Sequence, residues 1–344
     1  MATTRKEFLG ALALAGSALA LGAAEPTKKP GLRIGIIGCD TSHAPAFTGM
    51  LNAKKPDPIF NGARVTCAYK WGSRDLACAL TRYEKFIGQM KRSGVKMVDS
   101  IPELLAQCDA VCIETVDGRP HLAEAREVFA SGKPCFIDKP IAASLADAIK
   151  IVEEGRRTKA KWFCSSSLRY LPRLAAVRAG EFGRVRGADC WSPTTIEPTH
   201  SEFFWYAIHA AEPLFATMGT GCKEVRCTGT ETEDVAIGTW ADGRLGVMRA
   251  LNHTRPGCCY GGVAFCEGRK GQKARNGAVN LGPYDGYKAQ VIEIVRFFET
   301  GEVPVPAEET LEIYAFLEAA TQSKRRGGAA VSLAEVLAAA SKEK

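Results

Sequence analysis

Short apolar runs alternate with longer amphipathic segments between residues 32 and 164. The runs end at glycine or polar positions, as buried strands do, and the segments between them carry apolar residues at helical spacing. Strands that alternate with helices in this way predict an α/β domain built on a doubly wound parallel sheet with right-handed crossovers. The expected strands are Leu32–Ile37, Ala63–Tyr69, Lys96–Val98, Ala110–Ile113, Cys135–Ile137 and Lys161–Cys164.

Helix signals stand between these strands. Ser100 and Ser144 occupy positions where a helix N-cap is expected, and Asp147, three residues after Ser144, resembles the second member of a capping box. We therefore expect helices to begin directly after both serines. The full set of expected helices is Phe47–Leu51, Leu76–Ile87, Ile101–Ala106, His121–Ala130 and Leu145–Arg156.

The pattern changes after about residue 165, where strand-like segments follow one another without helices between them. Asp242-Gly243 is a strong signal for a tight hairpin. Consecutive strands predict a large antiparallel sheet in a second, α+β domain, so we divide the chain into residues 31–150 and 151–344. Two helices are expected near the end, one with apolar residues from Tyr287 to Phe298 and one at Thr310–Ser323. The expected strands are Arg184–Trp191, Glu224–Gly229, Asp234–Trp240, Arg244–Leu251, Tyr260–Glu267 and Ala278–Leu281.

Residues 1–24 have the pattern of an export signal. Arg5-Lys6 precedes Phe8-Leu9, an apolar run follows from Gly10 to Ala24, and its last three residues are small enough for cleavage. The basic pair predicts a signal of the twin-arginine type, which exports folded, cofactor-loaded proteins to the periplasm. An ordinary secretory signal and an uncleaved, lipid-facing anchor remain open as alternatives. The run is too short to favour a permanent transmembrane helix.

The formal charge of +7 is spread along the chain. The longest basic clusters, Arg156-Arg157 and Lys324–Arg326, are typical of solvated helix ends, so we expect no nucleic-acid partner. No membrane contact beyond the export signal is expected.

The thirteen cysteines are odd in number and scattered, and many lie inside apolar runs. That pattern is typical of small buried residues and not of a disulfide framework. Neither Cys108 and Cys112 nor Cys258, Cys259 and Cys266 shows the paired spacing of a zinc site, so the sequence predicts no metal.

The most informative stretch is Lys133–Ile141. Its apolar run ends in Asp138-Lys139-Pro140, and a helical pattern begins soon afterwards. Because open α/β sheets bind their ligands at the carboxyl ends of the strands, this corner is a candidate active site. Proline after Lys139 excludes the lysine from helical geometry.

With these residues the chain resembles the Gfo/Idh/MocA oxidoreductase family. The resemblance runs from about Leu32 to the C-terminus and is most specific over Glu114–Ser144, which contains His121 and the Asp138-Lys139-Pro140 corner. The family usually carries Glu-Lys-Pro here, so Asp138 is one methylene shorter. The resemblance implies a nicotinamide-binding Rossmann domain followed by a domain that binds a sugar or polyol.

In the family, the matching lysine exchanges a proton with the hydroxyl group of the carbon that loses hydride, so the resemblance assigns acid/base catalysis to Lys139. A purely structural lysine is the alternative. A second signature, an aspartate four residues before a histidine, matches only at His209, because Trp205 stands at the acid position. His209 is then a second catalytic and substrate-binding candidate or a structural histidine. Tyr206 and His200 are further substrate-binding candidates.

The cofactor loop departs from the family pattern Gly-x-Gly-x-x-Gly, which lets backbone approach a pyrophosphate. The matching positions begin at Gly38 and retain only that first glycine. Asp40 replaces the second glycine, and an unshielded carboxylate there would repel phosphate. Thr41, Ser42 and His43 can donate hydrogen bonds to phosphate, although His43 could instead stack or face a substrate.

Further cofactor contacts follow from the resemblance. After the second strand the family often has an acid for the adenosine ribose, whereas this chain has Lys70, Ser73 and Arg74, which favours NADP over NAD. Thr115 and His121 belong to the segment expected along the nicotinamide, and Asp138 adjoins it. Arg169 and Tyr170 follow the sixth strand and match a family segment that often contacts substrate.

The sequence therefore predicts an exported NAD(P)-dependent oxidoreductase of a carbohydrate or cyclic polyol. The three departures at Asp40, Lys70 and Trp205 leave two alternatives. One is an enzyme that retains its nicotinamide cofactor and uses transient oxidation for glycoside cleavage or elimination. The other is a non-catalytic sugar-binding relative. Homo-oligomers through the antiparallel sheet are expected by analogy with the family.

Overall fold

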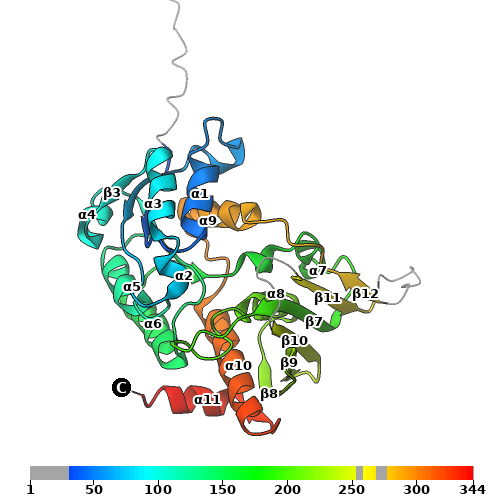
Figure 1. The fold of residues 1–344 in the computed structure, drawn as a ribbon. Helices are drawn as coiled ribbons and strands as arrows, with labels where there is room; N and C mark the ends of the chain where they lie inside the picture. The colour runs from blue at the N-terminus through cyan, green and yellow to red at the C-terminus, as the bar shows by residue number, and fades with distance from the viewer. Residues whose placement is uncertain (1–30, 253–258, 269–276, 344) are drawn as a thin grey trace, which may run out of the picture. The chain divides into compact units, whose positions relative to one another are not determined.

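The first sheet has six strands in the order β3-β2-β1-β4-β5-β6, and every neighbouring pair is parallel (Figure 1). The order reverses between β1 and β4, which creates the crevice where such sheets bind ligands. This confirms the predicted doubly wound parallel sheet. The strands are β1 (Arg33–Ile37), β2 (Arg64–Tyr69), β3 (Lys96–Val98), β4 (Ala110–Ile113), β5 (Cys135–Ile137) and β6 (Trp162–Cys164).

The computed structural model describes residues 31–252, 259–268 and 277–343. The predicted export signal at 1–24 lies outside the described residues, as does Cys258. Gly31–Lys344 forms one compact unit, and the expected domain boundary near residue 150 stays a prediction.

Helices flank the first sheet nearly as expected. Ser100 and Ser144 are confirmed as N-caps, because each hydroxyl accepts a hydrogen bond from the backbone N–H three residues on. The first helix begins at His43, four residues earlier than predicted, and the single helix expected at Leu76–Ile87 is two helices. The helices are α1 (His43–Leu51), α2 (Ala77–Leu80), α3 (Tyr83–Arg92), α4 (Ile101–Leu105), α5 (His121–Ala130) and α6 (Leu145–Thr158).

The second sheet has seven strands in the order β12-β11-β7-β10-β9-β8-β13. Five of its six neighbouring pairs are antiparallel, which confirms the predicted large antiparallel sheet, and β7 and β10 pair in parallel, so the sheet is mixed. The parallel pairing follows from the path of the chain. After β7, α8 (Ile208–Met218) crosses the sheet to β8, and the β8–β9 and β9–β10 hairpins then bring β10 beside β7. The strands are β7 (Val185–Thr194), β8 (Cys222–Gly229), β9 (Glu233–Trp240), β10 (Leu245–Asn252), β11 (Gly261–Cys266), β12 (Ala278–Asn280) and β13 (Val331–Ser332).

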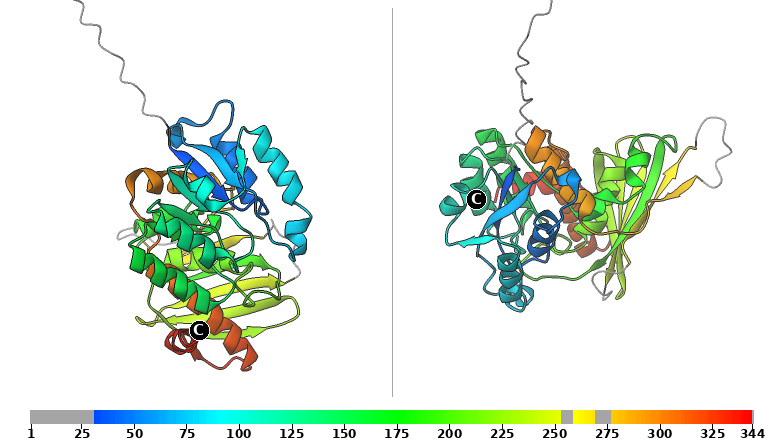
Figure 2. Two further views of the ribbon diagram at one scale, coloured as in Figure 1. Left: turned by 90° about the vertical axis from the view of Figure 1, so that its left-hand side faces the viewer. Right: turned by 90° about the horizontal axis from the view of Figure 1, so that it is seen from above.

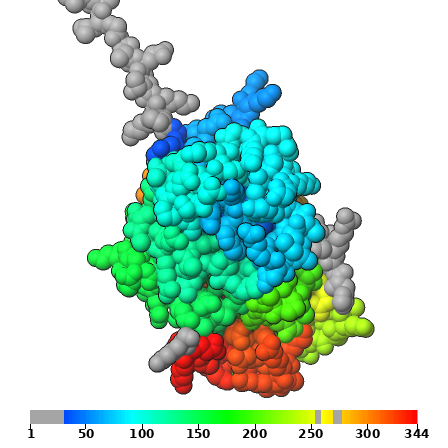
Figure 3. Space-filling model, turned by 60° about the vertical axis from the view of Figure 1, so that its left-hand side comes forward, coloured from blue at the N-terminus to red at the C-terminus, as the bar shows by residue number. Residues whose placement is uncertain are grey.

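Helices late in the chain return to the first sheet. The apolar face of α9 (Lys288–Thr300) packs with Phe47 of α1 and with Phe136 and Phe163 of the sheet, and Figure 2 shows α9 in orange beside these elements. α10 (Ala307–Arg325) contacts both α6 and β8, and α11 (Leu333–Ala340) follows it. In Figure 3 these two helices appear in orange to red directly below the cyan and green residues of the first sheet's layer. The two sheets therefore share one continuous structural unit.

Cysteines behave largely as predicted. Every cysteine in the part of the chain that the structure describes is free, and all of these except Cys78 and Cys259 are buried. Within the same described residues, none of the helices has the length and apolar character needed to cross a membrane.

Candidate active site

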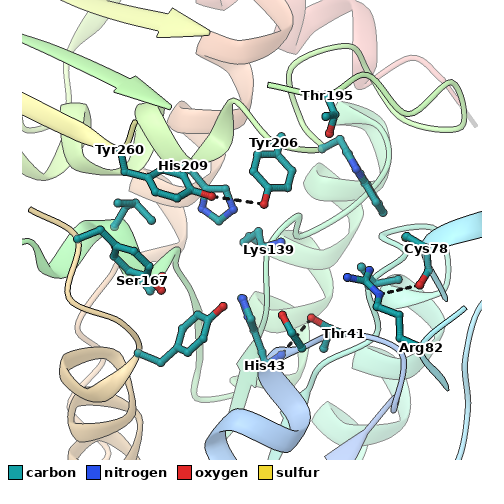
Figure 4. A pocket seen from close by; sticks show the side chains of 16 residues that line it. Thr41, His43, Cys78, Arg82, Lys139, Ser167, Thr195, Tyr206, His209 and Tyr260 are labelled. Carbon is teal, nitrogen blue, oxygen red and sulfur yellow. Dashed lines mark hydrogen bonds between the residues drawn. The ribbon is translucent and has the colours of Figure 1, made fainter. Parts of the chain in front are cut away.

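A cavity of about 440 Å³ lies at the carboxyl edge of the first sheet. Figure 4 shows Lys139 between His43 on one side and Tyr206 and His209 on the other. The structure therefore brings six predicted site residues together. The lining residues are Thr41, Ser42, His43, Cys78, Arg82, Val116, Lys139, Ser167, Leu168, Thr195, Trp205, Tyr206, His209, Tyr260, Tyr284 and Tyr287.

Lys139 reaches this cavity because β5 ends two residues earlier and Pro140, joined to it by a cis peptide bond, turns the chain away. The side chain is only 7% exposed. Its ammonium nitrogen lies 5.8 Å from the centre of the Tyr206 ring, within the range of a cation–π contact. The face of the Tyr206 ring, in the segment before α8, thus contacts Lys139 while the lysine nitrogen stays at the cavity.

His209 lies in the first turn of α8, where the backbone places its ring against the cavity. Its Nδ1 is 2.7 Å from the hydroxyl of Ser166, and that hydroxyl accepts a hydrogen bond from the backbone N–H of Leu168. The Ser166 hydroxyl can donate its own proton to Nδ1 while it accepts from Leu168, and in that arrangement the neutral ring carries its hydrogen on Nε2. Burial, reinforced by the charge of Lys139, holds the pKa of His209 well below its ordinary value. His209 is therefore a neutral imidazole.

Aromatic rings form one wall of the cavity. The ring of His209 lies 5.8 Å from Tyr260, Tyr260 lies 5.4 Å from Tyr284, and Tyr284 lies 6.2 Å from Tyr287. The series ends at His43, 4.6 Å from Tyr287. Such rings offer flat apolar faces with hydroxyl groups at their edges.

Asp40 does not face the cavity. Its carboxylate is fully buried and accepts hydrogen bonds from the backbone N–H groups of Ser73, at 2.8 Å, and Val116, at 3.0 Å. Burial raises its pKa, and these two donors oppose that rise. The expected repulsion of phosphate by an unshielded carboxylate is therefore wrong, because the side chain turns inward and ties the loops after β1, β2 and β4 together.

Several predicted cofactor contacts lie outside the cavity lining. Lys70 is exposed and pairs with Asp99 at 2.6 Å, and Arg74 is exposed as well. The Ser73 hydroxyl donates to Asp75 and Asp117 within the loops after β2 and β4. Gly38 is required by the fold, since a Cβ there would lie 2.6 Å from the backbone nitrogen of Thr115.

Three more predicted cofactor residues are buried beneath the cavity floor. The Thr115 hydroxyl donates to Glu124, whose pKa burial raises to about 8. The ring nitrogens of His121 lie 2.9 and 3.1 Å from the carbonyl oxygens of Thr115 and Ile141, so this ring joins the loops after β4 and β5. Asp138 is fully buried and lies 2.7 Å from His43.

The predicted substrate contacts Arg169 and Tyr170 also point away from the cavity. Arg169 is 2% exposed and pairs with two carboxylates, Glu212 at 2.9 Å and Glu309. The Tyr170 hydroxyl lies 3.4 Å from that of Ser165. Both side chains are held by other protein groups, Arg169 by Glu212 and Glu309 and Tyr170 by Ser165, so their role is structural.

His200 likewise holds a loop and does not line the cavity. Its Nε2 accepts a hydrogen bond from the backbone N–H of Gly118 at 2.9 Å, and its Nδ1 lies 2.9 Å from the Thr199 hydroxyl. Burial lowers its pKa to about 4. A neutral ring with both nitrogens engaged has no free position for proton exchange with a substrate.

Sequence reasoning missed Arg82, Cys78 and the tyrosines at 260, 284 and 287. Arg82 follows α2 and turns its guanidinium into the cavity, where its Nε donates to the Cys78 carbonyl at 2.6 Å. No motif marks these positions. The signal that could have found the aromatic wall is the presence of three of the eight tyrosines between residues 260 and 287.

The residues at the β1–β4 crevice fit a nicotinamide dinucleotide. Thr41 and Ser42 line the cavity at the start of α1, and a helix start is where such folds hold phosphate. Arg82 adds a positive charge on the same side, and the inward turn of Asp40 removes the carboxylate from this path. Lys139 lies between these residues and the side of the cavity that carries Tyr206 and His209 (Figure 4).

Comparisons with known proteins agree with this geometry. Residues 32–165 match the model of the Gfo/Idh/MocA family, described as an oxidoreductase family with an NAD-binding Rossmann fold. An inositol 2-dehydrogenase of Cereibacter sphaeroides is 34% identical over 122 residues, which cover 36% of this chain. The match spans about a third (32%) of that relative's length.

Two solved structures show the same fold along most of the chain. A proposed NADPH-dependent oxidoreductase from Desulfitobacterium hafniense has a TM-score of 0.68 at 17% identity, over 89% of this chain and 99% of that one. The scyllo-inositol dehydrogenase of Lactobacillus casei, solved with NAD(H) and scyllo-inositol, has a TM-score of 0.64 at 15% identity, over 88% and 99% of the two chains.

Proposed function

We propose that the chain is a member of the Gfo/Idh/MocA oxidoreductase family, whose model residues 32–165 match, and that it is a nicotinamide-dependent oxidoreductase of a carbohydrate or cyclic polyol. One observation carries the proposal: Lys139 and the neutral donor His209 line one cavity at the carboxyl edge of the Rossmann sheet. A lysine amine and an imidazole N–H are the groups needed around a hydroxyl that is to be oxidised.

In the direction of oxidation, the carbinol carbon loses a hydride and its oxygen loses a proton. A bound nicotinamide dinucleotide would supply the hydride acceptor. Lys139, when its amine is neutral, accepts the hydroxyl proton and returns it in the reverse direction. The Nε2–H of His209 donates to the same oxygen and fixes its position, since Ser166 holds the ring in this tautomer. The aromatic wall offers its faces to the ring of the substrate.

Thr41, Ser42 and Arg82 are the residues that would hold the dinucleotide phosphates, because they line the cavity at the start of α1. A preference for NADP remains part of the proposal. It rests on Lys70 and Arg74, which give the end of β2 positive charge where NAD enzymes usually carry an acid. The ratio of kcat/KM for the two dinucleotides tests it, and a preference for NAD contradicts it.

The activity is tested with the purified protein, a panel of inositols and sugars, and absorbance at 340 nm. Lys139→Met should lower kcat by roughly 10²–10⁴-fold, the usual contribution of general acid–base catalysis, with dinucleotide affinity changed only a few-fold. Lys139→Arg keeps the charge and should be almost as inactive, because guanidinium does not give up its proton. Lys133→Met, which changes a lysine in the same stretch outside the cavity, is the matched control.

The same preparation separates the alternatives. Nicotinamide that is released only on denaturation, with no turnover of added dinucleotide, supports the enzyme that retains its cofactor. Dinucleotide that exchanges and is reduced with a polyol supports the dehydrogenase. If the protein neither contains nor binds a dinucleotide, both enzyme hypotheses are wrong and the sugar-binding relative remains.

Export of the folded protein to the periplasm also belongs to the proposal, and it rests on the pattern of residues 1–24. Replacing Arg5 and Lys6 together by alanine should retain the protein in the cytoplasm if the basic pair is read by the twin-arginine system. Fractionation of cells that produce either form measures this. Equal export of both forms would favour an ordinary secretory signal.

Pairing of two chains through the second sheet is the last part of the proposal. The face of this sheet that points away from α8 exposes large apolar side chains, Ile237, Leu245 and Phe265. Leu245 pairs with Thr239 and Gly187, and Phe265 also pairs with Gly187, so Leu245 and Phe265 share one row of this face. Ile237 pairs with Val247 and lies in the next row. Leu245→Glu should convert the assembly to monomers in light scattering, whereas a wild-type monomer would contradict the proposal.

A further inference from the structure

Three polar side chains meet beneath the cavity without hydrogen-bond partners. His43 Nδ1, both carboxylate oxygens of Glu114 and both of Asp138 are buried, and none of these five atoms has a hydrogen-bond partner. His43 Nδ1 lies 2.7 Å from Asp138 Oδ2, but the pair does not have hydrogen-bond geometry. Buried polar atoms are nearly always partnered, so a convergent group of this kind calls for a ligand.

The sheet register explains why these residues converge. Ile113 of β4 pairs with Ile137 of β5, so the next residues, Glu114 and Asp138, leave adjacent strands side by side. The backbone N–H of Glu114 donates to the carbonyl of Ile37 on β1, from which the chain turns through Gly38 into α1. His43 is the first residue of that helix. Three neighbouring strand ends therefore direct one ligand-bearing side chain each to the same point.

Two carboxylates in this position repel each other strongly. Glu114 and Asp138 are both fully buried, and like charges in a medium of low dielectric constant cannot both stay ionised without compensation. A bound dication would neutralise the two negative charges and leave the cluster with no net charge.

We propose that His43, Glu114 and Asp138 bind a divalent first-row metal ion such as zinc or manganese. One nitrogen and two carboxylates are ligands that these ions accept in proteins. Ligand atoms about 2.0–2.2 Å from a common ion lie roughly 3 Å or slightly more from one another. The three ligand atoms of the cluster all lie within 4.8 Å of one another, with 2.7 Å for the closest pair, so small rotations complete the geometry.

Neighbouring groups hold His43 for this role. Its ring lies 5.7 Å from Phe47, one turn further along α1, and 4.6 Å from Tyr287 at the start of α9. His43 also lines the cavity, so an ion bound to its buried Nδ1 would lie next to the cavity. Three protein ligands with one open position is the arrangement of a catalytic metal site, whose fourth ligand is water or a substrate hydroxyl. This site goes beyond the proposed redox activity and does not depend on it.

The test is metal analysis of the full-length protein purified without chelators. We expect about one equivalent of a first-row divalent metal per chain. After treatment with a chelator, added Zn²⁺ or Mn²⁺ should raise the thermal unfolding midpoint, because a ligand that binds only the native state stabilises it. Glu114→Gln should lower the Zn²⁺ affinity by more than the roughly 10–100-fold that the loss of an outer-shell partner costs.

Two variants complete the design. Glu114→Gln removes a buried charge and should fold at least as stably as the metal-free wild type, so its lack of response to Zn²⁺ would not reflect unfolding. Glu124→Gln is the matched control, since it changes another buried carboxyl group outside the cluster and should bind metal like the wild type. The proposal is overturned if the wild type holds no metal and responds to neither ion, or if Glu114→Gln and His43→Ala bind metal as the wild type does. Dinucleotide binding and turnover do not enter these measurements, so the two proposals fail separately.

Discussion

Arg169→Met should destabilise the protein strongly, and more so at high pH. Arg169 and Glu212 are 2% and 1% exposed and lie 2.9 Å apart, with Glu309 on the other side of the guanidinium. Methionine keeps much of the side-chain volume but leaves a buried carboxylate without its partner. Breaking a buried pair in this way costs about 3–5 kcal/mol of unfolding free energy.

The pH dependence follows from Glu212. Burial raises the pKa of this carboxyl to about 7 in the folded protein, although Arg169 works to lower it. A raised acid pKa contributes stability at low pH that is lost as the pH rises through the folded value. Without Arg169 the pKa of Glu212 rises further, so the variant should lose more stability between pH 5 and pH 8 than the wild type does. At pH 5, with Glu212 protonated, the difference should shrink to about 1–3 kcal/mol, the cost of an unsatisfied neutral group.

Urea denaturation followed by tryptophan fluorescence at pH 5 and pH 8 measures both effects, since the midpoint and slope give the free energy. Arg156→Met is the control, because Arg156 forms a surface pair with Glu308 and its loss should not move the midpoint. The double variant Arg169→Met/Glu212→Leu should recover most of the loss, since apolar replacements of a buried pair are often neutral. A loss that is the same at both pH values, or a double variant no more stable than the single one, would refute this reasoning.

Three further substitutions test single contacts. Gly38→Ala should abolish dinucleotide binding and destabilise the protein, because φ is +89° there and the new Cβ would meet Thr115 at 2.6 Å; normal binding by calorimetry would contradict this. Ser166→Ala should lower kcat and leave dinucleotide affinity unchanged, because His209 loses the group that fixes its tautomer; an unchanged kcat argues against that role. Asp40→Ala should lower the free energy of unfolding by about 2–5 kcal/mol, because two buried N–H groups lose their acceptor, and a loss below 1 kcal/mol would contradict the observed contacts.

The first sheet could be predicted almost completely from the sequence, because its strands are short apolar runs with clear ends. Cys135–Ile137 and Ala110–Ile113 were placed without error, and the serine caps were found. The mixed second sheet could not be predicted, since local patterns carry no information on whether β7 and β10 run in the same direction. That direction depends on the path of the chain through α8.

The cavity was predictable only where a motif marks it. Lys139 and His209 were found through family motifs, whereas the tyrosines of the aromatic wall reach the cavity through long-range packing that no motif marks. Arg169 and His200 looked like substrate contacts by sequence position alone. Their hydrogen-bond partners, Glu212, Glu309 and Gly118, lie at least 43 residues away along the chain. No local sequence pattern therefore indicates that both side chains are hydrogen-bonded within the protein.

The inward turn of Asp40 has a mechanical consequence. One carboxylate bridges the loops that follow three different strands, so the dinucleotide side of the cavity moves as a single body and cannot open strand by strand. The amide protons of Ser73 and Val116 report on this directly: in deuterated water we expect them to exchange together and slowly, at a rate that a bound polyol leaves unchanged.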